Sequence, residues 1–129
     1  MAVSFSYDGR IVVVHMVGDY TTAELRQVVL ESLDDPASPP KPMMLFDLRE
    51  STAIQKRSAN EVKEMARFLA SIGHRFDHRA ALVASTDVAF GLMRLGSSLV
   101  TDGGPTPGVF RDVEAARAWL LDPNAPPQL

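Results

Sequence analysis

The chain opens with alternating apolar and polar residues and continues into a nearly unbroken apolar run. Residues 3–7 alternate, as expected of a strand with one face in water, and Asp8-Gly9 supplies the turn of a hairpin. Residues 11–17 are apolar except for His15, which is typical of a strand covered on both faces. We therefore predict an antiparallel edge strand followed by an interior strand, with His15 as a hydrogen-bonded core residue.

Four later segments have the apolar periodicity of helices that bury one face. Thr21-x-x-Glu24 and Ser58-x-x-Glu61 are capping boxes, in which two side chains satisfy backbone amides at a helix start. Asp112 is the expected cap of the last helix, and Gly73 ends the second. The predicted helices span about residues 22–34, 58–72, 87–100 and 112–121, and the further strands span residues 43–48, 80–84 and 109–110.

These elements follow the order ββαβαβαβα. Strand-helix-strand units make right-handed crossovers between parallel strands. The sequence therefore predicts an α/β fold with a five-stranded, mostly parallel sheet, one antiparallel edge strand and four helices. Residues 1–121 form the predicted domain, residues 122–129 a flexible C-terminal tail, and the glycine- and proline-rich stretch 102–108 a loop.

Composition narrows the choice of partners and of cellular setting. The 129 residues suit a single core, and a formal net charge of -3 gives no general attraction to nucleic acid. The absence of cysteine excludes disulfides, thiolate metal sites and cysteine nucleophiles. The first residues do not form a secretory signal, and no apolar run approaches the roughly 18 residues that span a bilayer. We expect a cytoplasmic protein with no nucleic-acid partner and no integral membrane segment.

Four short motifs, taken in their order and spacing along nearly the whole chain, are similar to those of a known family. They are Gly18-Asp19-Tyr20-Thr21, Asp47-Leu48-Arg49, Ala89-Phe90-Gly91-Leu92-Met93-Arg94, and Val109-Phe110-Arg111-Asp112 followed by Ala116, Ala118, Trp119 and Leu120. In these motifs the chain resembles the SpoIIAA-like domains. The resemblance implies a fold related to the STAS domains of bacterial anti-sigma-factor antagonists and to the lipid-carrying CRAL-TRIO domains, without implying one activity.

The segment before the second predicted helix departs from the antagonists of that family. Those proteins carry an Asp-Ser-Ser-Gly motif whose serine is phosphorylated and where a partner kinase docks. The corresponding residues here are Ile54-Gln55-Lys56-Arg57-Ser58. The phosphoswitch is therefore not carried over, and we expect Ser58 to act mainly as a helix cap.

Polar residues cluster where the parallel strands are expected to end. Ligands of open α/β sheets bind at this carboxyl edge, and helix starts there offer free amides that suit an anion. Arg49, Lys56 and Arg57 add positive charge near the second helix. The alternative is that Ser58 and Thr86 are ordinary caps and that the arginines form a solvated rim. The candidate ligand- or partner-binding residues are Asp47, Arg49, Ser58, Ser85, Thr86 and Asp87.

Asp47 raises a separate alternative. A carboxylate in an apolar strand needs a partner such as Arg49, a backbone amide or water. Together with Asp19 and the Ser85-Thr86 pair, Asp47 also faintly resembles the magnesium and phosphate pocket of a receiver domain. The end of the last strand carries Arg111 in place of a lysine, and the sequence has no adjacent acidic pair for that pocket. A phosphoacceptor-type domain using Asp47 is therefore the enzyme-like alternative.

The motifs of common enzyme classes are missing from the sequence. It has no Gly-x-Ser-x-Gly elbow, phosphate-binding loop or dinucleotide fingerprint. His74 and His78 have a spacing that binds metal on a helix, but they follow the helix-ending Gly73, so we expect surface histidines. The sequence thus predicts a protein that is not an enzyme and has no catalytic residue, cofactor or functional metal.

The third predicted helix has more apolar residues than one buried face requires. Val88, Leu92, Leu95 and Leu99 already form a core stripe at helical spacing. A second apolar face consists of Phe90, Met93 and Val100. Neighbouring loops or the last helix cover this face, or else it is a surface for a partner or ligand, for which Met and Phe are well suited.

Three functional hypotheses follow. The first is a non-enzymatic regulatory module that binds a protein partner, or itself as a homodimer, through the third helix and the carboxyl edge of the sheet. The second is a carrier or sensor of a small apolar or anionic ligand. The third is the phosphoacceptor domain using Asp47. A closed pocket under the third helix favours the carrier, whereas a flat exposed patch at Phe90 and Met93 favours the partner.

Overall fold

The strands of the sheet are neighbours in the same order as along the sequence, β1-β2-β3-β4-β5. The computed structural model describes residues 2–53, 56–77, 79–98, 106–122 and 124–125. The strands are β1 (Val3–Asp8), β2 (Ile11–Gly18), β3 (Met43–Ser51), β4 (Arg79–Val83) and β5 (Thr106–Phe110). The helices are α1 (Thr22–Asp34), α2 (Ala59–Ser71), α3 (Asp87–Ser98) and α4 (Val113–Leu121), with a short 3-10 helix, η2 (Gly73–Arg75), after α2.

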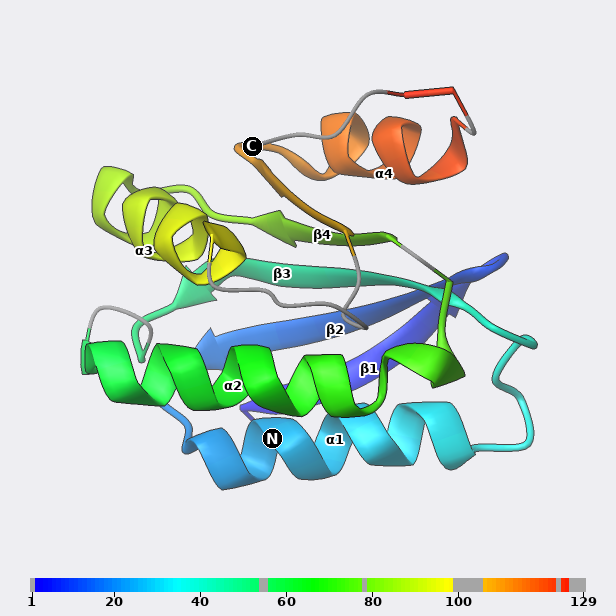
Figure 1. The fold of residues 1–129 in the computed structure, drawn as a ribbon, viewed down its shortest axis with the longest axis horizontal. Coiled ribbons are helices and arrows are strands. Elements are labelled where there is room, and N and C mark those ends of the chain that lie inside the picture. Colours follow the sequence, from blue (N-terminus) through cyan, green and yellow to red (C-terminus); the bar gives the residue numbers. More distant parts are fainter. Residues whose placement is uncertain (1, 54–55, 78, 99–105, 123, 126–129) are drawn as a thin grey trace.

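The sheet is parallel except at one edge, where β1 pairs antiparallel with β2. Because the strand order always advances in one direction, right-handed crossovers place α1, α2 and α3 on the same face. Figure 1 shows α1 and α2 side by side on that face and α4 on the opposite one, and α3 packs against β5 and α2. The predicted fold class, with its antiparallel edge strand and four helices, is confirmed.

Local signals in the sequence form the elements that they predict. Gly9 adopts a φ of 57° in the turn between β1 and β2, a conformation that glycine takes without steric cost. The Thr21 hydroxyl accepts a hydrogen bond from the Glu24 amide at the start of α1. The capping box of α2 is complete in both directions, and Asp112 caps α4 through the Ala115 amide at 2.7 Å.

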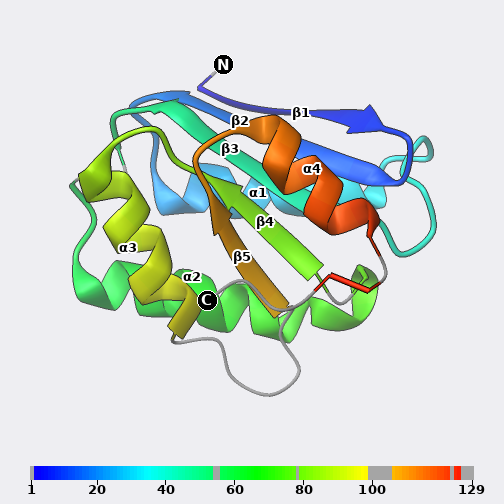
Figure 2. The same ribbon diagram turned by 90° about the horizontal axis from the view of Figure 1, so that it is seen from above.

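The two faces of the sheet have separate cores, since successive residues of a strand point to opposite faces. Val12, Val14 and Met16 of β2 pack toward α1, α2 and α3. Ile11 of β2 belongs to the smaller core under α4, together with Trp119. Seen from above, α4 lies over part of the sheet only (Figure 2), where it contacts β3, β4 and β5.

This partial cover corrects the prediction for His15. Its side chain is 41% exposed instead of lying in a core. The continuous apolar run of β2 predicts cover on both faces, but the nine-residue α4 contacts mainly β3, β4 and β5 and packs against only Ile11 and Val13 of β2. This face of β2 is therefore covered at Ile11 and open at His15.

The prediction of a loop over residues 102–108 is wrong at its end. Residues 106–108 belong to β5, and residues 102–105 lie outside the described part of the chain. Proline is tolerated in β5 because the strand is at the sheet edge. Gly108 has a packing reason, since a Cβ there would lie 2.8 Å from the Phe110 ring and 3.1 Å from the Trp119 ring.

The buried face of α3 also differs from the predicted stripe. Val88 is 59% exposed, whereas Ala89 and Met93 are buried. The α3 register is therefore turned by about one residue from the stripe that the apolar spacing predicts. Two apolar stripes on one helix leave the choice between them to tertiary packing, which the spacing alone does not encode.

The chain beyond α4 is attached to the sheet as far as it is described. The buried guanidinium of Arg79 donates hydrogen bonds to the carbonyls of Trp119, Asp122 and Ala125. Ala125 also packs against the core under α4. In the described residues, no helix combines the length and the apolar character needed to cross a membrane.

Candidate ligand site between the helices and the sheet

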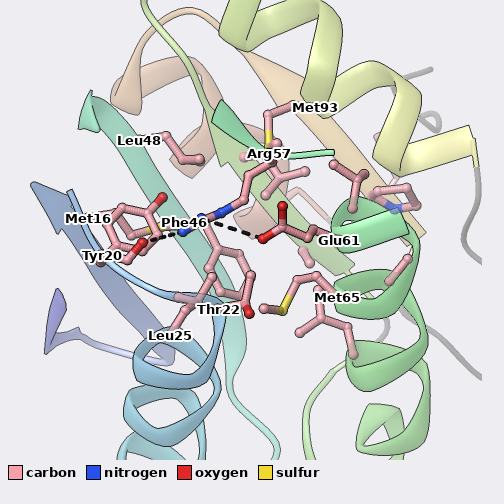
Figure 3. A pocket seen from close by; sticks show the side chains of 16 residues that line it. Met16, Tyr20, Thr22, Leu25, Phe46, Leu48, Arg57, Glu61, Met65 and Met93 are labelled. Atoms are coloured by element: carbon pink, nitrogen blue, oxygen red, sulfur yellow. Dashed lines mark hydrogen bonds and ion pairs between the residues drawn. The ribbon is translucent and has the colours of Figure 1, made fainter. Parts of the chain in front are cut away.

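A cavity of about 100 Å³ lies between the sheet and helices α1, α2 and α3. Its walls are almost entirely apolar. Met16 and Phe46 come from strands β2 and β3, and Leu25, Met65 and Met93 come from α1, α2 and α3 (Figure 3). Each of the three helices therefore contributes to the site, which lies partly under α3 and is partly open to solvent.

The polar side chains of the cavity gather at one place, between the start of α1 and the start of α2. Arg57 donates a hydrogen bond to the carbonyl of Tyr20, and its guanidinium lies 5.3 Å from the centre of the Tyr20 ring. On its other side, Arg57 Nη1 is 3.7 Å from Glu61 Oε2. Arg57 thus extends across the space between the two helix starts, as Figure 3 shows.

The residues around Arg57 are themselves held in place. The Tyr20 hydroxyl and the Ser51 hydroxyl are 2.9 Å apart. Burial raises the pKa of Tyr20, outweighing the Ser51 hydrogen bond and the Arg57 charge. Glu61 Oε1 accepts the Ser58 amide at 3.1 Å, and this bond, aided by the Ser58 hydroxyl and by Arg57, keeps the pKa of Glu61 below its usual value. Glu61 is therefore a carboxylate near neutral pH.

The basic residues Arg49, Lys56 and Arg57 do not form one anion site. Lys56 Nζ pairs with Asp19 at 3.2 Å on the surface, and Arg49 pairs with Asp47. Only Arg57 of these three lines the cavity.

The residues predicted at the carboxyl edge also separate into several small groups. Ser85 donates a hydrogen bond to the Arg49 carbonyl at 3.0 Å, so it lies beside the Asp47-Arg49 pair. Thr86 accepts the Ala89 amide as a cap of α3. Asp87 forms an ion pair with Arg111 at 2.9 Å.

Asp47 lies in a row of polar side chains on the face of the sheet that α4 covers in part. Its two oxygens accept hydrogen bonds from Arg49 Nε and Nη2, both at 2.9 Å. His15 Nδ1 is 4.0 Å from Asp47 Oδ2, and His15 Nε2 is 2.9 Å from the Ser6 hydroxyl. Burial raises the pKa of Asp47. The hydrogen bonds from Arg49 and the charges of Arg49 and His15 lower it by more, so the pKa of Asp47 is below its usual value.

The second apolar face predicted for α3 is divided in the structure. Met93 is 8% exposed and lines the cavity, while Phe90 is half-buried. The Phe90 ring lies under the guanidinium of Arg111, 4.2 Å from its centre, and more loosely under that of Arg94. Val100 lies outside the described residues. As an interface, these three residues stay a prediction.

Sequence reasoning does not find the cavity, although it names some of its residues. In the sequence Arg57 is only one of three neighbouring cations, and Met65 only part of a buried stripe. The available signal is the gathering of methionines, Met16, Met65 and Met93, on elements predicted to share one face. Methionine is flexible and often fills irregular gaps, so this gathering marks a loosely filled core. No group of three or more described His, Asp or Glu side chains could hold a metal ion.

Comparison with known proteins addresses the family and the fold. The family model described as SpoIIAA-like matches residues 11–121. Among solved structures, the chain is similar to an uncharacterized protein with a SpoIIAA-like fold from Shewanella loihica. The two have 20% sequence identity, a TM-score of 0.60, and 92% of each chain covered. No curated protein matches the sequence at a significant level.

Proposed function

The chain belongs to the SpoIIAA-like family, and on that premise we propose that it is a non-enzymatic regulatory module that binds a small apolar ligand. SpoIIAA-like domains generally have regulatory or protein-binding roles. The cavity between α1, α2, α3 and the sheet supports a ligand as the regulating input. The observation that carries this proposal is the position of Met93, which faces the cavity under α3 instead of forming a flat exposed patch.

The size of the cavity sets the size of the ligand. An engineered protein cavity of about 150 Å³ binds benzene, so about 100 Å³ with flexible methionine walls suits a body of roughly six carbons. Burying six carbons gives a gross gain of about 5 kcal/mol. Since about 4 kcal/mol corresponds to a Kd near 1 mM, we expect a Kd on the order of 0.1 to 10 mM for a neutral six-carbon probe.

A titration with hexanol followed by amide NMR tests the proposal. Shifts should concentrate on residues around the cavity. Ala66 is buried and lines the cavity, so Ala66→Leu fills part of the space and should weaken binding about 10-fold or more while the protein stays folded. Ala118→Leu, on the exposed side of α4, is the matched control and should bind normally. Hexanol that causes no saturable shifts, or that binds both variants alike, would contradict the proposal.

A protein partner, including a second copy of the chain, is the second candidate. The supporting observations are the exposure of Val88 on α3 and the surface position of Phe90 between two arginines. Native mass spectrometry of freshly purified protein separates the two candidates, because it reports a copurified small molecule and a dimer in one measurement.

The geometry gives little support to the phosphoacceptor alternative. Both oxygens of Asp47 are bound by Arg49, and its side chain is only 12% exposed. Asp19 pairs with Lys56 instead of contributing to an acidic cluster at Asp47. A phosphate donor would have to displace the Arg49 pair before it reached the carboxylate.

A further inference from the structure

The cavity contains one feature that a purely apolar ligand does not use. Its lining includes Arg57, whose side chain is only 14% exposed. A cation beside an apolar surface costs free energy unless its charge and its N–H groups are satisfied. The hydrogen-bond partners of the Arg57 N–H groups therefore indicate which kind of ligand the cavity suits.

The hydrogen-bond partners of Arg57 are incomplete. A guanidinium has five N–H donors. One nitrogen, Nη2, donates to the Tyr20 carbonyl. Nη1 is 3.7 Å from Glu61 Oε2, which is an ion pair but too long for a hydrogen bond. Among the described residues, no acceptor is within hydrogen-bond reach of Nε or Nη1. Every fully buried side-chain nitrogen or oxygen in the described residues has a hydrogen-bond partner. Because Nε and Nη1 of Arg57 have none among those residues, these two atoms are accessible to solvent or to a ligand.

Glu61 is prevented from completing the pair because it serves the helix. Its Oε1 accepts the Ser58 amide, and its own amide donates to the Ser58 hydroxyl at 3.2 Å. Moving the carboxylate closer to Arg57 would break the capping box of α2. Arg57 therefore has an anion nearby that offsets its charge without occupying its donors.

We propose that the ligand is an amphiphile with a single compact anionic head, a carboxylate or a phosphate monoester, which Arg57 binds while the apolar body fills the cavity. This inference rests on the proposed function and specifies its ligand class. Arginine binds such heads with charge-assisted N–H···O bonds, and the Nε and Nη1 groups of Arg57 are donors available for them. The ligand replaces the long Arg57-Glu61 contact with short charge-assisted bonds, and Glu61 keeps its capping role.

The test compares three probes with the same six-carbon body, namely hexanol, hexanoate and hexyl phosphate, by amide NMR titration at pH 7.5. A charged head bound by Arg57 should make hexanoate or hexyl phosphate bind about 10-fold more tightly than hexanol. The stronger of the two identifies the head. If hexanol itself does not bind, the proposed function fails. If hexanol binds and neither anion binds more tightly, only the anionic head is refuted.

Two variants assign any such preference to Arg57. Arg57→Met keeps an unbranched apolar chain but removes the charge. Its affinity for the anion should therefore fall about 10-fold or more, and its affinity for hexanol should fall less than about 3-fold. Lys56→Met removes the neighbouring surface cation and should leave both affinities unchanged. An equal loss in both variants would show that only the general surface charge matters and would overturn the assignment.

Glu61→Gln provides an independent measurement if Arg57→Met does not fold. Glutamine at this position also completes a capping box, so α2 should remain intact. Without the competing carboxylate, the anion should bind about 3-fold or more tightly while hexanol is unaffected. Unchanged or weaker anion binding in this variant would contradict a role for Arg57 as the head-group ligand.

Discussion

Asp47 illustrates at the scale of one residue how a carboxylate is accommodated next to an apolar core. Its neighbours Phe46 and Leu48 are buried in the core under α1, α2 and α3, whereas Asp47 points to the opposite face of the sheet and meets Arg49. The chemistry of this pair could be predicted from the sequence, because an unpaired carboxylate there is unfavourable. The exposure of His15 could not, because it depends on how far α4 extends over the sheet.

The Asp47-Arg49 pair should make stability depend on pH. Because the folded-state pKa of Asp47 is lowered, its contribution is present above the unfolded-state pKa of about 3.9 and is lost as the pH falls through the folded-state value. Asp47→Asn should lower the free energy of unfolding by about 1 kcal/mol at pH 7, discounted for the exposure of Arg49.

Urea unfolding at several pH values checks this prediction, and the difference from the wild type should shrink below about pH 4. Asp87→Asn is the control, because the Asp87 side chain is 94% exposed and its pair with Arg111 should contribute little. A loss for Asp47→Asn that is the same at pH 3 and pH 7 would indicate a packing effect without a charge contribution.

The element scale is where local sequence signals are most reliable. The caps at Thr21, Ser58 and Asp112 depend on side chains within three residues of the helix start, so the sequence contains all that is needed to predict them. The strand predicted at residues 109–110 is too short, because Pro107 and Gly108 normally mark a loop. Only the edge position of β5 and the ring of Trp119 explain them.

Gly91 in α3 and Gly108 in β5 test whether a glycine is required by its local conformation or by packing. Gly91 lies in α3, and a Cβ added there would have nothing within 4 Å, so Gly91→Ala should raise the free energy of unfolding by about 0.5 to 1 kcal/mol. Gly108→Ala places a Cβ against the Phe110 and Trp119 rings and should lower it by about 1 to 3 kcal/mol. Thermal unfolding of the two variants should therefore show shifts of opposite sign. A neutral Gly108→Ala would mean that α4 moves away from β5 at little cost.

Ser58 allows a cap to be distinguished from a switch. Ser58→Ala removes the acceptor for the Glu61 amide and should lower the free energy of unfolding by about 1 kcal/mol. Ser58→Asp should be close to wild type, because aspartate is an equally good N-cap. Ligand and partner binding should be unchanged in Ser58→Ala. Phosphate on Ser58 in cells, or binding lost without a change in melting temperature, would instead support a phosphoswitch.

For the whole molecule, the sequence indicates which residues are buried but not where the packing is incomplete. Four of the six methionines, Met16, Met44, Met65 and Met93, lie in or beside the larger core, and three of them line the cavity. The cavity lies between the sheet and the three helices that pack on one of its faces. This space depends on the relative placement of α1, α2 and α3, which no local pattern specifies.

Met93 is one of the side chains through which α3 packs against the larger core, so its substitution tests the position of this helix. Met93 is buried beside the cavity, so Met93→Glu should place a charge without a partner in the larger core and lower the free energy of unfolding by roughly 3 kcal/mol or more. Val88→Glu, near the start of α3 on its exposed side, should change it by less than about 0.5 kcal/mol. Urea unfolding measures both changes, and light scattering follows the oligomeric state. If Met93→Glu stays fully stable and instead converts a dimer to a monomer, Met93 lies in an interface between copies. Loss of fold in Met93→Glu with an unchanged oligomeric state in Val88→Glu would show that Met93 belongs to the core and that Val88 lies in no interface between copies.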